Sequence, residues 1–380
     1  MPQDDWESLR REMPVAGNWA YFDHAAVAPL PRPAYDVMCA WARDQLEGGA
    51  VNWSTWSRRL DQTRAAGAQL LGAAPEEIAL LRNTTEGVNL VAEGFPWRSG
   101  DNVVLPSCEF PSNRFPWLNL KSRGVEARVV ACRDGKIEPA AISEACDART
   151  RIVACSWVHY ATGWRSDVGA LAEVAHRAGA LFFLDAIQAL GVLPLDVRQA
   201  GVDFLAADGH KWLIGPEGAA LFYLRREHLD RLRPIGVGWN SVEAAADFSS
   251  QEMHLKPTAA RYEGGTYPVA GLVGLGASLE LLLQHSQAAR AERLLQLTDE
   301  LCERLIEIGA TIFSDRQGDH RSGIVAFDVP GEDPRQVVKR CRTHHVVINS
   351  RDGRLRASPH LYNNQEDLDR LVGALTTKKT

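Results

Sequence analysis

The sequence predicts an α/β protein with an open, mostly parallel sheet and a second, smaller domain. Two apolar runs, at 181–184 and 202–207, are short and stop on polar residues, as strands buried in a parallel sheet do. Strand and helix patterns alternate around them, which favours a sheet covered by helices. The 380 residues exceed one typical domain, so a large domain and a smaller one are expected.

Hydrophobic periodicity and boundary residues predict the elements in chain order. In the first half of the chain, helices are expected at 4–12, 33–47, 58–71, 84–92, 138–146 and 167–178. Strands in the same half are expected at 19–22, 78–81, 102–105, 127–131 and 150–158. The tryptophan-rich segment 52–56 is assigned to packing, in preference to a substrate wall or an interface.

The second half of the chain completes the large sheet and then contributes the helices and short strands of the smaller domain. Strands are expected at 181–184, 202–207 and 219–224, a loop-rich segment at 240–258, and helices at 269–285 and 289–308. Short strands at 311–313, 322–327, 346–348 and 354–357 predict a small antiparallel sheet, with helices at 334–342 and 361–375.

Two strand ends deliver a carboxylate and an amine to the same edge of the sheet. Asp185 ends one apolar run, and Lys211 follows the next run within Asp208-Gly209-His210-Lys211. Open α/β sheets bind their ligands beyond the carboxyl ends of their strands. A lysine that forms a Schiff base and an acid that pairs with a pyridine nitrogen are what pyridoxal phosphate (PLP) requires. Alternatively, Asp185 caps the next helix and Lys211 is a solvated surface charge.

A phosphate site is expected where hydroxyl side chains stand at a strand-to-helix junction. Thr84 and Thr85 follow the strand 78–81 and begin a helical pattern. Free amides and the helix dipole favour an anion there, and the hydroxyls add donors. Helix capping by Thr84, with Glu86 in the first turn, is the alternative and has the same geometry.

Asp185-Ala186-Ile187-Gln188 and Gly209-His210-Lys211-Trp212 together resemble the class V aminotransferases. These fold type I PLP enzymes include cysteine desulfurases and isopenicillin-N-epimerase-like proteins, and the resemblance runs from about Tyr21 to Leu375. It implies a seven-stranded, mostly parallel sheet between helices and a small C-terminal α+β domain. The expected division is an arm at 1–20 that packs on the small domain, a large PLP-binding domain at 21–265, and a linking helix with the small domain at 266–380.

The resemblance also assigns roles to individual residues. Lys211 and Asp185 are catalytic, and Arg356 holds the substrate α-carboxylate, for which a guanidinium is suited. Ala26 lies on a loop at the substrate entrance. Thr266 reaches the phosphate from the neighbouring subunit, which implies a homodimer with shared sites. The expected cofactor-binding residues are Thr84, Thr85, Phe110, Tyr160, Asp185, Gln188, His210, Lys211 and Thr266.

Three positions depart from the pattern of the family. Phe110 replaces a histidine that stacks on the pyridine ring, so it offers a π face and no proton. Tyr160 replaces an asparagine, and its phenol is expected to donate a hydrogen bond to the cofactor. Asp208 replaces a hydroxyl residue beside the phosphate, where a carboxylate is repelled. It must turn away, be neutral or be bridged by a cation.

The absence of a cysteine from the segment 346–353 reduces the number of reactions that the chain is expected to catalyse. Cysteine desulfurases carry a nucleophilic cysteine on a loop shortly before the carboxylate-binding arginine, but residues 346–353 contain none and Cys341 lies earlier. A conventional persulfide-forming desulfurase is therefore disfavoured. A Lys211 aldimine and a quinonoid remain, which lead to transamination, to β-elimination such as C–S cleavage, or to epimerisation.

Composition excludes several other classes. The net charge of −6 argues against nucleic acid or an anionic membrane as the main partner. No secretory signal, membrane-length apolar run or metal-ligand spacing is found, and seven scattered cysteines favour a cytoplasmic location. A Rossmann oxidoreductase lacks its GxGxxG motif. A PLP-binding homologue without catalysis is disfavoured by the presence of Lys211, Asp185 and Arg356 together.

Overall fold

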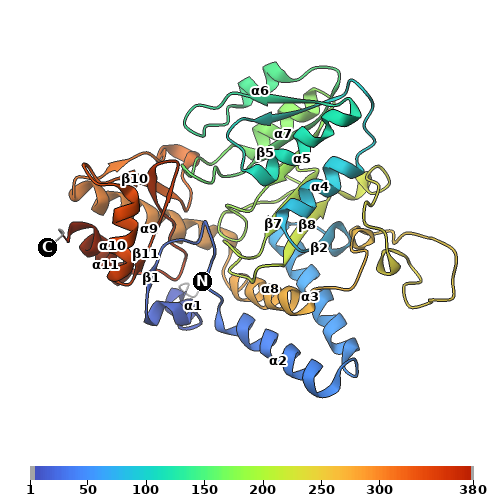
Figure 1. Cartoon of the computed structure of the whole chain (residues 1–380), viewed down its shortest axis with the longest axis horizontal. Coiled ribbons are helices and arrows are strands. Elements are labelled where there is room, and N and C mark those ends of the chain that lie inside the picture. Colours follow the sequence, from blue (N-terminus) through green and yellow to red (C-terminus); the bar gives the residue numbers. More distant parts are fainter. Residues whose placement is uncertain (1–4, 378–380) are drawn as a thin grey trace.

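The computed structural model describes residues 5–377 and is built on a seven-stranded sheet (Figure 1). The strands follow the order β2-β8-β7-β6-β5-β3-β4; β8 is antiparallel to both neighbours, and the other pairings are parallel. The predicted fold class is therefore confirmed. The strands are β2 (Ile78–Leu81), β3 (Asn102–Pro106), β4 (Glu126–Val130), β5 (Thr150–Ser156), β6 (Leu181–Asp185), β7 (Phe204–Asp208) and β8 (Ala220–Leu224).

The main sheet is buried on both faces. Neighbouring side chains on a strand point to opposite faces, so Leu80 and Val104 enter one core while Leu81 and Val103 enter the other. Polar side chains are thereby left mainly to the strand ends. The first core is covered by α3 (Trp53–Leu71), α6 (Pro139–Ala145), α7 (Val168–Arg177) and α8 (Val269–Leu282), and the second by α4 (Thr84–Gly94) and α5 (Phe115–Asn119).

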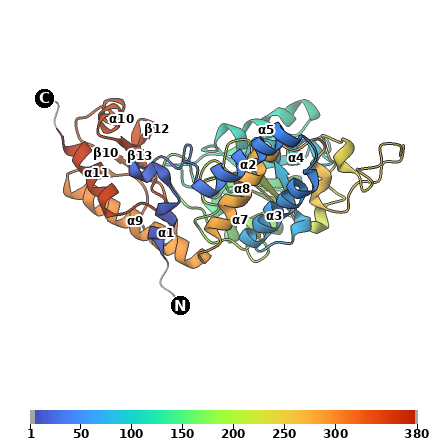
Figure 2. The same cartoon turned by 90° about the horizontal axis from the view of Figure 1, so that it is seen from below.

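Helices α2 (Arg32–Gly48) and α3 pack side by side with α8 (Figure 2). A glycine in α8 makes this approach possible, because a Cβ at Gly276 would lie 2.3 Å from Thr63 Oγ1. The same hydroxyl of Thr63 donates a hydrogen bond to Leu272 O at 3.1 Å. Small residues thus let α3 contact the backbone of α8 directly.

The C-terminal part forms a separate core around a four-stranded antiparallel sheet, in the order β12-β13-β10-β9. The small antiparallel sheet was predicted; the strand at 354–357 has the predicted bounds, and the strand predicted at 322–327 lies at 325–328. Its elements are α9 (Gln287–Glu307), β9 (Thr311–Ile312), β10 (Val325–Asp328), α10 (Pro334–Thr343), β12 (Asn349–Arg351), β13 (Arg354–Ala357) and α11 (Gln365–Thr376).

The prediction that 346–348 joins this sheet is wrong. Strand β11 (Val346–Val347) pairs in parallel with β1 (Ala20–Tyr21), and β12 takes the expected place beside β13. Val346 and Ala20 are both fully buried in the C-terminal core, so the two short strands stabilise each other there. The apolar pattern of residues 346–348 indicates a strand but carries no information about a partner more than 300 positions away.

The N-terminal helix α1 (Trp6–Arg11) lies against the C-terminal part of the chain (Figure 1). Arg10 forms an ion pair with Asp367 at 2.7 Å and donates to Tyr362 O at 3.1 Å. The Trp6 ring stacks on His285 at 4.3 Å between ring centres. The first predicted helix begins at Asp4, which lies outside the described residues, as do residues 378–380.

Two further boundaries differ from the prediction. The tryptophan-rich segment is the first turn of α3, which begins at Trp53 five residues before the predicted start. The short helix α5 was not predicted, because its five residues are fewer than the periodicity of an amphipathic helix needs.

Within the described part of the chain, no helix by itself has the length and hydropathy of a membrane span. Helices α8 and α9 meet the criterion only as a pair, and their axes are bent by 85° to each other.

The amino end of the sheet is held by a buried carboxylate. Asp203 accepts hydrogen bonds at 2.8 Å from His176 Nε2, His228 Nε2 and the Phe182 amide. Burial opposes its charge, but the hydrogen bonds hold the pKa of Asp203 below its ordinary value. This group contributes stability above pH 4, and that contribution is lost as the pH falls through its lowered pKa.

Replacement Asp203→Asn should lower the free energy of unfolding by about 3 kcal/mol, because it removes the charge that three donors share. Urea denaturation at pH 7 measures the change. Asp230→Asn is the control, since that side chain is almost fully exposed and the change should stay within about 0.5 kcal/mol. Equal stability of the two variants would contradict the structural role of Asp203.

Candidate active site

A small cavity opens beyond the carboxyl ends of β3, β5, β6 and β7. Parallel pairing of β6 with β7 sets Asp185 opposite Ala206, so the end of β6 lies beside the segment that leads to Lys211. The predicted residues Asp185 and Lys211 line the cavity together. Its walls are Cys108, Glu109, Phe110, Ile137, Ser156, Val158, His159, Tyr160, Asp185, Ile187, Gln188 and Lys211.

Asp185 is buried at the base of this cavity, with 3% of its surface exposed. Its Oδ1 accepts a hydrogen bond from the Ile187 amide at 3.1 Å. Burial raises the pKa of Asp185 to about 6, although this hydrogen bond and the charge of Lys211 oppose the shift. With a pKa of about 6, this carboxyl is mostly ionised at neutral pH and can pair with a cationic group.

Lys211 supplies an amine whose charge is also disfavoured. Burial lowers the pKa of Lys211 to about 8; the charge of Asp185 opposes the shift and the charge of Arg356 adds to it. Its Nζ lies 5.6 Å from the centre of the Phe110 ring. A sizeable fraction of the amine is therefore neutral near pH 8, as a nucleophile or general base requires.

The two predicted aromatic residues form one wall. Phe110 and Tyr160 meet edge to face with their ring centres 5.4 Å apart. Tyr160 lines the same cavity as Lys211, and burial raises the pKa of its phenol. The phenol is therefore a hydrogen-bond donor at neutral pH.

The predicted phosphate residues lie at the start of α4 and after β7. Thr84 is buried and its Oγ1 accepts a hydrogen bond from the Asp208 amide at 2.9 Å. The helix cap is Asn83, whose side chain accepts from the Glu86 amide at 2.8 Å, so the alternative of capping by Thr84 is wrong. Thr84 is the first residue of α4, and its hydroxyl instead accepts a hydrogen bond from Asp208, the last residue of β7.

Asp208 turns toward His210 and keeps one oxygen without a partner. Its Oδ2 lies 3.7 Å from His210 Nδ1, and its buried Oδ1 has no hydrogen bond within residues 5–377. A buried carboxylate oxygen in this state is costly unless a ligand or ion satisfies it. The surroundings of Asp208 therefore indicate a bound polar group.

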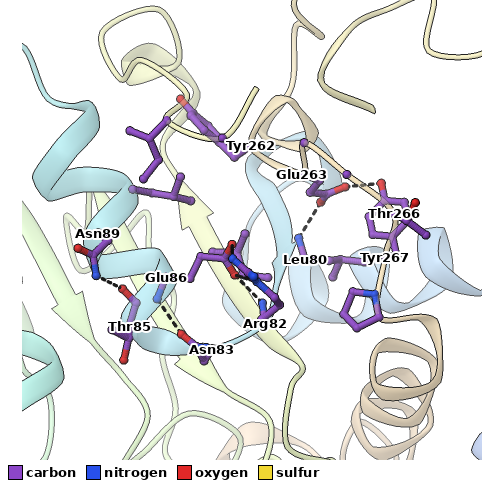
Figure 3. A pocket seen from close by; sticks show the side chains of 17 residues that line it. Leu80, Arg82, Asn83, Thr85, Glu86, Asn89, Tyr262, Glu263, Thr266 and Tyr267 are labelled. Atoms are coloured by element: carbon purple, nitrogen blue, oxygen red, sulfur yellow. Dashed lines mark hydrogen bonds and ion pairs between the residues drawn. The ribbon is translucent and has the colours of Figure 1, made fainter. Parts of the chain in front are cut away.

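Thr85 and Thr266 line a second, larger cavity of about 680 Å³ and stand on opposite sides of it (Figure 3). The Thr266 segment is anchored by buried Glu263, which accepts from the Leu80 amide at 2.7 Å and from Tyr267 Oη at 2.5 Å. Arg64 pairs with the same carboxylate at 2.5 Å. Thr266 itself is exposed, and the structure does not bring it into the Lys211 cavity.

Gln188 forms hydrogen bonds with two different segments of the site. Its Nε2 donates to Ala25 O at 3.0 Å, and its Oε1 accepts from Trp212 Nε1 at 3.0 Å. The loop that carries Ala26 is thereby fixed against the segment that carries Lys211. Ala26 is half-buried on this loop, and it does not line the Lys211 cavity.

Arg356 is almost fully buried at 1% exposure, and it already has an anionic partner. Its guanidinium pairs with Asp23 Oδ1 at 3.1 Å and donates to Tyr160 O at 2.6 Å. Its Nε is buried without a partner among residues 5–377. Asn349 Nδ2 donates to the second oxygen of Asp23 at 2.7 Å. The predicted carboxylate ligand thus lies in a network whose other members were not predicted.

Sequence reasoning also missed Glu109 and Cys108 on the cavity wall. Glu109 accepts from the Ser156 amide at 2.6 Å and from Asn113 at 2.9 Å, and burial raises its pKa to about 8. The Cys108 thiol is hydrogen-bonded to Cys132, and this contact, with burial, raises the pKa of Cys108. Their place at the end of β3, directly before Phe110, was the signal that could have found them.

Comparisons with known proteins agree with this arrangement. The family model described as aminotransferase class-V matches residues 20–371. A probable cysteine desulfurase of Methanothermobacter thermautotrophicus is 32% identical, over 96% of each chain. The apo cysteine desulfurase of Thermococcus onnurineus aligns with a TM-score of 0.86 and 26% identity, covering 97% of this chain and 96% of that one. The cystine C–S lyase C-DES, in complex with cysteine persulfide, aligns with a TM-score of 0.88 and 24% identity, over 96% and 98% of the chains.

Replacement Asp185→Asn should lower the pKa of Lys211 below about 8, since it removes the charge that favours the ammonium form. NMR titration of ligand-free protein labelled at the lysine Cε atoms measures this value, and the chain has only seven lysines to assign. Asp36→Asn, at an exposed position on α2, should leave the titration unchanged. A Lys211 pKa at or above the wild-type value in the Asn variant would refute the coupling.

Proposed function

Because this chain belongs to the class V aminotransferase family and is a PLP-dependent enzyme, we propose that it cleaves the C–S bond of a cysteine-type amino acid by β-elimination. The single observation that carries this proposal is the absence of a loop cysteine beside a complete lysine–aspartate site. Without a thiol to accept sulfur, the products are a thiol, ammonia and pyruvate, formed with consumption of one water molecule.

The residues present fit the cofactor. Asp185 is a buried carboxylate suited to a pyridinium nitrogen, and Lys211 shares its cavity as the amine for the aldehyde. The Phe110 ring provides a flat apolar face on the same wall. Thr84 at the start of α4 and His210 after β7 lie at the expected place of the phosphate, and the Asp208 carboxylate beside them opposes the charge of that group. When bound, PLP supplies the electron sink that stabilises a carbanion at the substrate Cα.

The proposed roles of the side chains follow from their charge states. Lys211, with its pKa lowered to about 8, takes the Cα proton and holds it where a leaving sulfur can receive it. Arg356, whose buried Nε has no partner among residues 5–377, is the proposed ligand of the substrate α-carboxylate. Tyr160, whose phenol stays protonated, donates a hydrogen bond at the cavity wall.

Persulfide transfer lacks a suitable nucleophile. Residues 346–353 form β11, β12 and the tight turn before β13, and Cys341 is fully buried in α10. Cys108 lines the Lys211 cavity, but its raised pKa keeps it a thiol, which is a poor nucleophile. C-DES, which shares the fold, is described as a cystine C–S lyase.

Transamination and epimerisation use the same lysine and remain the competing reactions. Product analysis of the holoenzyme with L-cysteine and S-substituted cysteines separates these reactions. β-Elimination gives pyruvate and ammonia, transamination gives a keto acid that keeps its sulfur and releases no ammonia, epimerisation gives the D-amino acid, and desulfuration gives alanine and sulfane sulfur. We expect pyruvate and ammonia in equal amounts, retained in Cys108→Ser within about twofold. Alanine as the main product, lost in Cys108→Ser, would refute the proposal, and a chain that binds PLP without turnover is the non-catalytic alternative.

We also propose a homodimer with shared sites. Thr266 is exposed and its segment is rigidly anchored by Glu263, as a residue that acts in a second subunit would be. Large exposed apolar side chains, among them Trp239 and Phe248, lie on the nearby loop 235–258. All seven cysteines are free, in keeping with the proposed cytoplasmic location.

Replacement Asp208→Ser should strengthen PLP binding at least several-fold, because it removes a carboxylate from the proposed phosphate site and adds a hydroxyl donor. PLP is removed from the enzyme, and the apoenzyme is then titrated with PLP. The change in absorbance during the titration gives the dissociation constant. Asp230→Ser, far more exposed, is the control and should not change it. Weaker binding in Asp208→Ser would show that this carboxylate supports the cofactor, either as a neutral acid or through a cation.

A further inference from the structure

A second guanidinium stands beside the Arg356 network. Arg351 ends β12, is half-buried, and donates through Nη1 to Asn349 Oδ1 at 3.2 Å and to Ser350 O at 3.0 Å. The same Asn349 donates to Asp23. One asparagine therefore orients the carboxylate that neutralises Arg356 and also holds the Arg351 side chain.

Arg351, unlike Arg356, has no anionic partner. The Arg356 charge is balanced by Asp23 at 3.1 Å. Within residues 5–377, no carboxylate oxygen lies within 4 Å of the Arg351 guanidinium, whose Nη2 and Nε make no hydrogen bond there. A half-buried guanidinium with free donors is suited to bind a carboxylate in two-point contact.

The charge of Arg351 acts on the cavity. Arg351 and Arg356 both disfavour the charged form of Lys211, and Arg351 and Arg114 both act on the Tyr160 phenol. In the pairing of β12 with β13, Asn349 lies opposite Arg356 and Arg351 lies opposite Arg354, so these side chains share one face of the small sheet.

We propose that Arg351 is a specificity-determining residue that binds a second carboxylate, carried by the group on the substrate sulfur. This inference rests on the proposed function, because it names the substrate class of the same site: cysteine S-conjugates with an anionic substituent. For S-carboxymethylcysteine the reaction consumes one water and gives thioglycolate, pyruvate and ammonium. Arg356 holds the α-carboxylate, and Arg351 holds the carboxylate on the leaving group.

The test compares two substrates of nearly equal size and opposite charge character. S-carboxymethylcysteine carries the second carboxylate, and S-carbamoylmethylcysteine carries a neutral amide in its place. For the wild-type holoenzyme, kcat/KM should favour the carboxylate roughly 10- to 100-fold, as expected for one charge-assisted contact. In Arg351→Gln this ratio should fall toward one, because the carboxylate substrate loses far more of its kcat/KM than the amide substrate does. Arg351→Lys should keep an intermediate ratio.

Arg354 offers a matched control on the adjacent strand. It is paired with Arg351 across β12 and β13, but its guanidinium is already engaged by the Phe313 ring, whose centre lies 3.6 Å away. Arg354→Gln should keep the wild-type ratio. A ratio near one in the wild type, or a ratio unchanged in Arg351→Gln, would overturn the assignment of Arg351.

A binding measurement separates this inference from the proposed reaction. Each amino acid is titrated into the holoenzyme, and the shift in cofactor absorbance gives its dissociation constant without requiring turnover. A preference for the carboxylate that depends on Arg351, without formation of pyruvate, would refute β-elimination and support the assignment of Arg351. Formation of pyruvate from both substrates, together with equal dissociation constants, would support β-elimination and refute the assignment of Arg351.

Discussion

The constraint on which the structure depends is that both faces of the main sheet are covered by helices. Polar side chains in β6 or β7 have no solvent to face along the strand, so Asp185 and Asp208 stand at the carboxyl ends. At this edge each charge is only partly hydrated, and Asp185 and Lys211 are shifted toward their neutral forms. The reactivity of the site thus follows from the same burial that stabilises the sheet.

Charged side chains farther from this edge also depend on one another for stability. Arg356 is balanced by Asp23, and Asn349 holds Asp23 in place. Phe110 contributes no titratable group at the cavity wall, and Tyr160 keeps its proton. Glu109 has its oxygens engaged by Ser156 and Asn113. His159 also lines the cavity, but its Nδ1 is engaged by Thr162 and burial lowers its pKa to about 4. Lys211, with a pKa of about 8, is therefore the base best matched to move a proton near neutral pH.

The fold and the centre of the site could be predicted because their signals are local. An apolar run that stops on Asp185, and another that leads to Lys211, place both groups at strand ends without knowledge of any distant residue. The pairing of β11 with β1 and of Arg356 with Asp23 depends on residues more than 300 positions apart, for which the sequence has no local pattern. The cap at Asn83 was missed for a different reason, since two adjacent residues were both suitable and tertiary contact with β7 decided between them.

The contacts of Asp23 also bear on how the enzyme is made. The loop after β1 leaves the ribosome more than 300 residues before Arg356 and Ser358, which hold it. During synthesis the large sheet has all its strands by residue 224, but Asp23 still lacks Asn349 and Arg356, to which it is hydrogen-bonded in the finished fold. A nascent chain can thus complete its main sheet well before the pairing of Asp23 with Arg356 can form, so the wall that these residues build is among the later parts of the fold.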